Sequence, residues 1–564
     1  MADKVERIYT NFRGVDFRGD DVHLSRSPDS VNMWRNYRET SGIRTRPRMG
    51  LGYDCKNVFG VFFYNGWMVL HCGKTLEILK GNGKVEYLHN NMNEARSRFF
   101  VFKEKLYVMD GVNYLVYDGE TCKDVCEDAF VPTTRNGAKP AGGGNPYQDV
   151  NLLSDYKKNS FLADGESKEY YLDAMAIDAV TEVRINGEIQ GADQYSVDTV
   201  AGKVTFKTAP SVPLTDGQDN VVITYKRTVA GHRDKILKCT LVQFFDNRIF
   251  VSGNDEYPNA VWHCNLEDPS YFSDLDEYGE GLYSSRVRGL VVGNNALWVF
   301  CEPSDANTTI FYHTPTTDDE YGKVYPYVHS SIATGCVGAA INFNDDIVFF
   351  SDRGMEGISG DITTEQVVAH RSTLVDRKLL ADSRYKDMIL AEWEGYLVVI
   401  IGNRAFLADS RAVFTNEHHY EYEWFYWDLE QNITCAYVYE GVLYLGRKDA
   451  LVCIDPTQHI TNTRYDSQDS YWTTPKDKFG QPHKLKTTNK RGCVAEATGY
   501  ITVYAKVEDT EFEEIGKYEN VTDYFVSRIK RKKFKDIQLK FYSLRGFSLE
   551  SVTLEAYLGG YIKR

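Results

Sequence analysis

The densest group of side chains able to do chemistry lies in residues 416–429, NEHHYEYEWFYWDL. Two adjacent histidines stand beside three glutamates, and six aromatic residues follow or interleave with them. Histidine and carboxylate groups are zinc ligands, whereas flat aromatic rings offer apolar faces on which a sugar can stack. The stretch therefore presents three alternatives: a metal site, a sugar platform, or an ordinary strand.

Alternation along this stretch favours the strand. Successive side chains of a strand point to opposite faces, so His418 and His419 cannot bind one ion unless the backbone bends. One face would carry His419, Glu421 and Glu423, which we expect to meet solvent or a neighbouring subunit. The other face is wholly aromatic, as in a half-buried strand packed between sheets. The residues of this aromatic face are Tyr420, Tyr422, Trp424 and Tyr426.

A second acid-rich stretch covers residues 257–281. Its acids suggest a calcium loop or the paired carboxylates of a glycosidase. The segment DLDEYGEG lacks the spacing and the flanking helices of an EF-hand, and glycosidase carboxylates meet only in three dimensions. Calcium binding and glycan hydrolysis therefore both stay open as alternatives. The acids are Glu267, Asp268, Asp274, Asp276, Glu277 and Glu280.

Other signals of catalysis are missing from the sequence. There is no GxSxG elbow, no P-loop and no HExxH pair. We therefore expect no enzyme, with no catalytic residue, no cofactor and no metal. The eleven cysteines include no CxxC pair, which predicts reduced thiols in a protein made in a cytoplasm.

The strongest positive patch is SRIKRKKFKD, residues 527–536. Lysines on a strand edge block unwanted pairing, which is the simpler interpretation. A contact with nucleic acid or with an acidic protein neighbour is the alternative. The candidate contact residues are Arg528, Lys530, Arg531, Lys532, Lys533 and Lys535.

The elements that must position these groups follow a repeat. An apolar strand, a polar two-residue turn and a second apolar strand recur seven times, starting at Phe62, Val101, Phe244, Val291, Ile341, Ala391 and Tyr437. The turns are rich in Asn, Asp and Gly, which tolerate the positive φ of tight hairpins. They are Asn65-Gly66, Lys103-Glu104, Asp246-Asn247, Asn294-Asn295, Asn344-Asp345, Glu394-Gly395 and Glu440-Gly441.

Seven hairpins at a spacing of about 40–50 residues predict an all-β fold with a β-propeller of about seven blades. An ordinary β-sandwich with many hairpins is the alternative. One long gap interrupts the repeat, so the propeller is expected in two parts, residues 51–137 and 231–460. Residues 138–230 are interpreted as a linker and a small inserted β-sandwich domain. A Pro/Gly-rich break, residues 131–148, precedes its strands.

Two terminal regions flank the propeller. Residues 1–50 form an N-terminal segment, and residues 461–564 predict a C-terminal domain of β-sandwich or jelly-roll character. The likeliest short helix covers residues 371–382, RSTLVDRKLLAD.

Charge is unevenly distributed along the 564 residues, whose net charge is −15. Residues 1–50 hold 10 basic and 7 acidic groups, and residues 470–564 hold 18 basic and 12 acidic groups. The middle is therefore strongly acidic, which disfavours tight DNA binding because affinity for a duplex comes mostly from basic groups. The sequence contains no run of 18 apolar residues, so we expect no membrane span. The N-terminus MADKVERIYT lacks the apolar stretch of a secretory signal.

Three stretches together resemble a known family. They are DNRIFVSGNDEYPNAVWHCNLEDPSYFSDLDEYGEG from Asp246, FRGVDFRGDDVHLSRSPDSVNMWRNYRETSGIRTRPRMG from Phe12, and SYWTTPKDKFGQPHKLK from Ser470. With the inserted domain, they are similar to the β-propeller tail nozzle proteins of short-tailed bacteriophages, also called tail stabilization proteins. The resemblance covers nearly the whole chain, but it rests on order and pattern rather than on a catalytic motif.

The resemblance implies a structural virion protein. Such proteins form a ring, expected to be hexameric, below the portal and its adaptor, where they continue the DNA channel and hold the genome until ejection. The implied partners are further copies of the chain, portal and adaptor proteins, tail fibres or other tail proteins, and double-stranded DNA passing without sequence-specific binding. The implied location is the virion tail, assembled in the cytoplasm of a bacterial host.

Two further functions remain open from the residues alone. A propeller of a phage tail can hydrolyse a host glycan, which would place catalysis among the acids of residues 267–280. It can instead bind a glycan or receptor, with Tyr422, Trp424 and Tyr426 as the stacking platform.

Overall fold

The computed structural model describes residues 3–38, 42–81, 83–304, 308–318, 322–329, 332, 334–359, 367–416, 419–458, 460, 464–467, 469–529 and 533–562. Throughout these ranges the regular structure is almost entirely β. The helical elements there are α1 (His232–Leu237), α2 (Asp376–Leu379) and the 3₁₀ turn η1 (Tyr385–Asp387). Helix α2 lies inside residues 371–382, so the short helix predicted there is confirmed.

The chain divides into two compact units. The first unit comprises residues 1–73, 78–84 and 334–564, and the second comprises residues 74–77 and 85–333. Each unit has hydrophobic cores of its own.

Seven four-stranded antiparallel sheets occur among the described residues, and they are the blades of the predicted β-propeller. One blade consists of β8 (Val58–Tyr64), β9 (Trp67–Cys72), β10 (Thr75–Leu79) and β11 (Val85–His89). The second unit contains three blades. They are β12 (Arg98–Phe102), β13 (Lys105–Met109), β14 (Tyr114–Tyr117) and β15 (Cys122–Asp124); β25 (Leu241–Phe245), β26 (Arg248–Asn254), β27 (Tyr257–Asn265) and β28 (Asp268–Gly279); and β29 (Val287–Gly293), β30 (Ala296–Cys301), β31 (Ile310–His313) and β34 (Tyr327–His329).

The first unit contains the other three blades. They are β35 (Ala340–Phe343), β36 (Asp346–Ser351), β37 (Gly354–Ser359) and β38 (Val367–His370); β39 (Ile389–Trp393), β40 (Tyr396–Ile401), β41 (Arg404–Asn416) and β42 (His419–Asp428); and β43 (Cys435–Tyr439), β44 (Val442–Gly446), β45 (Leu451–Ile454) and β7 (Met49–Tyr53). In this last blade, a strand from the start of the chain pairs with β45 and supplies the fourth position. Backbone hydrogen bonds thus join distant parts of the sequence, as ring closure of a propeller requires.

All seven predicted hairpin turns are present. Each has positive φ at both central residues, the geometry of a type I′ turn. Even Lys103 and Glu104, which are not typical of such turns, adopt φ of 46° and 62°. The twist of a type I′ turn matches the twist of the strands that it joins, so the local sequence fixes each hairpin.

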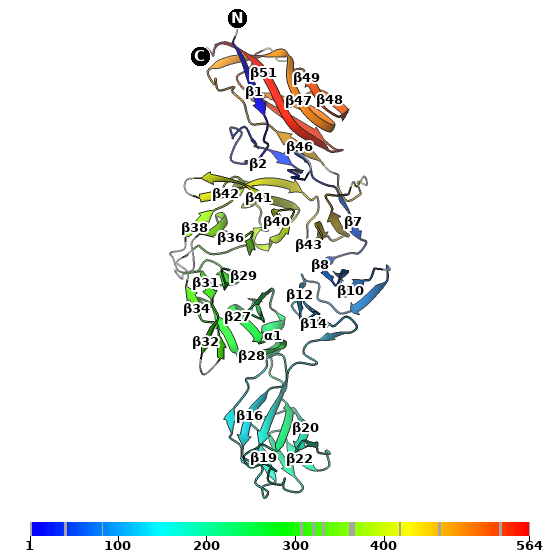
Figure 1. Ribbon diagram of the computed structural model, residues 1–564, viewed down its shortest axis with the longest axis vertical. Helices are drawn as coiled ribbons and strands as arrows, with labels where there is room; N and C mark the ends of the chain where they lie inside the picture. The colour runs from blue at the N-terminus through cyan, green and yellow to red at the C-terminus, as the bar shows by residue number, and fades with distance from the viewer. Residues whose placement is uncertain are drawn as a thin grey trace. The chain divides into compact units, whose positions relative to one another are not determined.

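The inserted module forms two sheets (Figure 1). The first contains β16 (Thr133–Ala138), β17 (Asn145–Pro146), β18 (Tyr156–Phe161), β20 (Ala179–Ile185), β21 (Glu188–Ile189) and β24 (Val221–Lys226). The second contains β19 (Glu169–Tyr171), β22 (Tyr195–Asp198) and β23 (Lys203–Phe206). The expected break at residues 131–148 is wrong in part, because β16 pairs in parallel with β18 despite the neighbouring prolines and glycines.

The C-terminal domain is built on a ten-stranded sheet to which the N-terminal segment contributes. From the C-terminal region come β46 (Ser470–Thr473), β47 (Lys484–Val507), β48 (Glu513–Val521), β49 (Tyr524–Ser527), β50 (Ile537–Ser543) and β51 (Phe547–Tyr561). From the N-terminal segment come β1 (Lys4–Tyr9), β4 (Ser30–Val31), β5 (Met33–Trp34) and β6 (Ile43–Thr45). Figure 1 shows β1, in blue, beside β51, in red, and six consecutive residue pairs join them.

Two small ribbons complete the described strands. They are β2 (Gly14–Val15) with β3 (Arg26–Ser27), and β32 (Thr316–Asp318) with β33 (Gly322–Val324).

Candidate functional site

Strand β42 contains the aromatic candidate residues, and it is the fourth strand of its blade. Tyr422 and Trp424 are buried, with 3% and 0% of their surface exposed. They share a core cluster with Val15 and Phe17 of the N-terminal segment and with side chains of β36 and β40. The cluster thus fills the space between adjacent blades, and residues of the N-terminal segment pack against it.

The polar ends of these aromatic side chains are used inside the protein. The Tyr422 hydroxyl donates to Asp346 at 2.9 Å, and the Trp424 indole N–H donates to the carbonyl of Arg371 at 3.2 Å. Tyr426 packs half-buried against the same cluster, while Tyr420 is 38% exposed. Tyr422 and Trp424 therefore do not form the exposed stacking platform that was one alternative.

The glutamates of β42 were expected to face solvent or a neighbouring subunit, and this prediction is wrong for two of them. Glu421 and Glu423 are 2% and 0% exposed. Arg26 donates to both oxygens of Glu423, at 2.8 and 2.7 Å, and Arg13 lies 3.6 Å away. Thr373 donates to Glu421 from its backbone N–H and its hydroxyl, at 3.1 and 3.0 Å. Each carboxylate is held by a segment distant in sequence, which explains why alternation alone misplaced them.

The expected exposure of the two histidines cannot be compared with the structure in the same way. Glu417 and His418 lie outside the described residues, as does the side chain of His419.

Buried arginines are the structural residues that the sequence did not reveal. Arg46 donates to both oxygens of Asp466, at 2.7 and 2.9 Å, and both side chains are fully buried. Arg371 donates to Asp346 at 3.0 Å and to the carbonyl of Tyr420 at 3.1 Å. Such charge-assisted forks hold two segments in one geometry. The only local signal was the unusual number of arginines in residues 1–50.

The second acid-rich stretch forms β27 and β28 in the second unit, and four of its six acids have separate partners. Glu267 pairs with Lys103 at 2.9 Å on the surface, and Asp268 caps the turn at Ser270. Glu277 accepts a hydrogen bond from Lys235 at 2.9 Å. The buried Glu280 lies 2.6 Å from His313 Nε2. Glu267, Asp268, Glu277 and Glu280 thus each contact a different group and do not pair with one another.

Asp276 is the acid of β28 whose electrostatics stand out. Burial, followed by the nearby Asp149 and Asp274, raises the pKa of Asp276 to about 6, while Arg248 opposes the shift. Its nearest cationic candidate, His263, lies 3.7 Å away, and burial lowers the pKa of this histidine to about 4. Asp276 therefore titrates near pH 6 beside a neutral histidine. A search of the described ranges finds no group of three or more His, Cys, Asp or Glu residues placed to hold a metal ion.

The basic candidate patch follows β49. Arg528, Lys533 and Lys535 are exposed, whereas Lys530, Arg531 and Lys532 lie outside the described residues. The backbone N–H of Lys535 donates to Glu508 at 3.1 Å, which places this end of the patch beside an acidic turn.

Two global properties complete the description. All eleven cysteines lie in the described ranges, and none of them forms a disulfide. In the part of the chain that the structure describes, no helix is long and apolar enough to cross a membrane.

Comparison with known proteins gave structural likenesses only. No family model and no curated protein matches the chain. A streptogramin B lyase structure is 9% identical, with a TM-score of 0.34, and the match covers 72% of this chain and 96% of that one. BamB from Moraxella catarrhalis is 11% identical, with a TM-score of 0.31 and coverage of 77% and 99%. An exo-β-1,3-galactanase from Phanerochaete chrysosporium is 11% identical, with a TM-score of 0.23 and coverage of 56% and 95%.

Proposed function

We propose that this chain is a structural protein of a bacteriophage tail, a nozzle whose subunits form a ring below the portal and adaptor. The ring continues the DNA channel, retains the packaged genome and conducts it at ejection. In this role the chain is not an enzyme and needs no cofactor. It works in the virion tail, in contact with other tail proteins such as fibres.

The observation that carries this proposal is the way the first unit is tied together. The N-terminal segment supplies four strands to the C-terminal sheet and the closing strand of a blade. Between these strands, Arg26 and Arg46 make buried two-point bonds to Glu423 and Asp466. A chain that crosses repeatedly between a propeller and a second domain resists separation of the two, which suits a wall that must withstand packaged DNA.

The residue types that suggested chemistry support the same conclusion. Glu421, Glu423, Tyr422 and Trp424 are occupied by partners inside the protein. The hydrogen bonds and packing of these side chains therefore position the N-terminal segment against the blade, as expected for an architectural protein.

The negative net charge of the chain is compatible with a channel through which DNA passes. The central channel of a single propeller is too narrow for a duplex, so in our proposal the DNA runs along the axis between subunits. The chain carries a net charge of −15, and an acidic surface repels phosphates instead of holding them. Binding to DNA is accordingly weak and independent of sequence.

The test is to locate the chain in intact particles. Antibody labelling or an added tag should place it on the tail, and particles lacking it should package DNA but fail to retain it. A full, stable and infectious particle without this protein would contradict the proposal. So would catalytic turnover of a host glycan by the purified chain, because turnover would favour the hydrolase alternative.

A further inference from the structure

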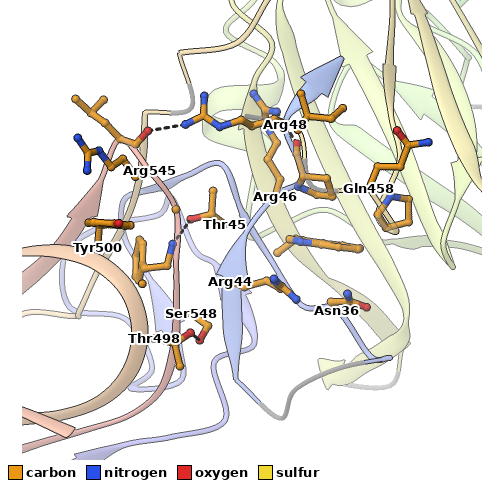
Figure 2. A pocket seen from close by; sticks show the side chains of 18 of the residues that line it. Asn36, Arg44, Thr45, Arg46, Arg48, Gln458, Thr498, Tyr500, Arg545 and Ser548 are labelled. Carbon is orange, nitrogen blue, oxygen red and sulfur yellow. Dashed lines mark hydrogen bonds between the residues drawn. The ribbon is translucent and has the colours of Figure 1, made fainter. Parts of the chain in front are cut away.

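A cavity of about 1120 Å³ lies in the first unit where the N-terminal segment meets the C-terminal domain. Its walls carry four arginines: Arg44, Arg46, Arg48 and Arg545. Figure 2 shows the first three rising from the N-terminal segment, while Arg545 and Tyr500 come from the C-terminal domain. We call this site the arginine cavity. Among the described residues, Glu550 is the one carboxylate that lines it.

The four arginines are engaged to different degrees. Arg46 is neutralised by Asp466. Arg48 donates to two backbone carbonyls, those of Asp466 and Leu544, at 3.1 and 2.8 Å. The guanidinium of Arg545 lies 4.9 Å from the ring centre of Tyr500. Among the described residues, neither Arg48 nor Arg545 has a carboxylate within 4 Å, so neither forms a direct ion pair; Asp466 and Glu430 act on Arg48 from farther away.

Two further features point to a missing ligand. Burial lowers the pKa of Arg44 and of Arg48, which means that each cation is partly removed from water. The indole N–H of Trp34, a residue 2% exposed that lines the cavity, has no hydrogen-bond partner in the described part of the chain. A buried donor without a partner is unfavourable, and an anionic ligand in the cavity would accept its hydrogen bond.

The layout of the charges selects the kind of anion. In Figure 2 the Arg44 side chain extends toward Asn36, while Arg48 and Arg545 lie at the other side of the cavity. Spread charges suit an extended segment with several carboxylates better than one small ion. A DNA duplex is about 20 Å wide and does not enter a cavity of this size. An acidic protein segment does.

The same domain presents such a segment at the β47–β48 turn. We call residues 508–514, EDTEFEE, the acidic hairpin. Its Asp509 side chain is 96% exposed and pairs with Lys476 at 3.1 Å. Glu511, Glu513 and Glu514 are exposed and make no ion pair with any described residue. Among the described residues, the acidic hairpin therefore projects three carboxylates that form no ion pair.

The two features lie at opposite ends of one stretch of sheet. Tyr500 of the cavity and Asp509 of the hairpin are nine residues apart along β47 and its turn, or about 30 Å at the rise of a strand. The hairpin therefore cannot fold back into the cavity of its own chain. Two different complementary patches on one rigid domain make a head-to-tail contact, which generates a ring when the rotation closes.

We propose that the acidic hairpin of one copy of this chain occupies the arginine cavity of the next copy. This proposal rests on the ring of the proposed function and names the contact that builds it. Arg48, Arg545 and the Trp34 N–H receive the carboxylates of Glu511, Glu513 and Glu514.

The test uses two full-length variants, each lacking one half of the contact. The cavity variant is Arg48→Gln/Arg545→Gln, and Arg545→Gln alone is a milder form at an exposed position. The hairpin variant is Glu511→Gln/Glu513→Gln/Glu514→Gln. A matched control, Glu120→Gln/Glu166→Gln/Glu188→Gln, removes three exposed carboxylates elsewhere. Circular dichroism and thermal melts verify that all variants fold.

Mass photometry then gives the decisive pattern. The parent chain and the control should associate at about 50 mM salt and dissociate at about 500 mM, because screening weakens exposed ion pairs. Each variant alone should be monomeric, with association weakened at least about tenfold. An equimolar mixture of the two variants should form dimers and stop there, because only one intact contact remains.

Other outcomes overturn the proposal. They are association of either folded variant at the parent level, a mixture that stays monomeric, or a parent chain that is monomeric at every concentration. None of these results affects the proposed function, which is tested separately by the place of the protein in the particle.

Discussion

Strands β42 and β28 are the two most acidic strands that the sequence offered as sites, and their carboxylates have opposite environments. In β42, Glu423 is enclosed by Arg26 and Arg13, and Glu421 is held by Thr373. In β28, Asp276 faces two other carboxylates and a neutral histidine. Glu421 and Glu423 are held by distant partners, whereas burial and two neighbouring carboxylates raise the pKa of Asp276 to about 6.

The difference teaches that acid content on a strand does not identify a site. The environment of each carboxylate depends on which side chains the rest of the fold places beside the strand. Arg26 and Arg13 of the N-terminal segment bind Glu423 of the blade. At Asp276, burial and the nearby Asp149 and Asp274 outweigh the opposing charge of Arg248. Three predictions test this contrast, in order of decreasing effect.

The largest effect is expected from breaking the pair in β42. Arg26→Met should lower the unfolding free energy of the first unit by about 3–5 kcal/mol, since it leaves Glu423 buried beside only the more distant Arg13. Chemical denaturation followed by tryptophan fluorescence measures this, because Trp424 and Trp427 lie on the same strand. The double variant Arg26→Met/Glu423→Gln should recover much of the loss. A single variant within about 1 kcal/mol of the parent would show that the pair is not structural.

An opposite and smaller effect is expected in β28. The pKa of Asp276 is about 6 in the folded chain, above its ordinary value of about 3.9. Because the pKa is higher in the folded chain than in the unfolded chain, this carboxyl does not oppose folding at a pH below its ordinary pKa. The folded state loses stability as the pH rises from the ordinary pKa through 6. Asp276→Asn should therefore stabilise the second unit at pH 7.5 by about 1–2 kcal/mol, after allowance for its partial exposure.

At pH 3.5 the same substitution should make little difference, since most of the Asp276 carboxyl is then protonated in both states. Thermal melts at the two pH values provide the comparison. A gain of equal size at both values, or destabilisation at pH 7.5, would show that Asp276 is not a crowded anion.

The smallest effect is expected at the exposed end of β42. The Arg371 guanidinium lies 3.9 Å from the ring centre of Tyr420, and Asp346 holds the same arginine. Tyr420→Leu should cost about 0.5–1 kcal/mol, the strength of a partly exposed cation–π contact. Equilibrium denaturation beside Tyr87→Leu, at a residue 63% exposed, separates this contact from general surface effects. A loss above about 3 kcal/mol would mean that Tyr420 belongs to the core.

The propeller could be predicted because its signals are local. Each blade contains a two-residue turn between apolar strands, and a turn such as Asn65-Gly66 specifies its hairpin without help from distant residues. The seven turns gave the number of blades. The sequence also placed the short helix α2, which follows from a local pattern.

The partners of the candidate site could not be predicted, because they depend on contacts across the sequence. Arg26 and Glu423 are 397 positions apart, and Lys4 and Glu555 are 551 positions apart. Alternation assigned Glu421 and Glu423 to a solvent face because a single strand does not reveal what covers it. The strands that the N-terminal segment adds to the C-terminal sheet were missed for the same reason.

The central claim is that the chain is a ring-forming tail nozzle, and cryo-electron microscopy of intact particles tests it most directly. Our account predicts a ring of copies of this chain directly below the portal and adaptor. Each copy should show a seven-bladed propeller, and DNA or its path should follow the ring axis. A complete tail in which this chain is absent, or is present as single copies away from the channel, would contradict the account.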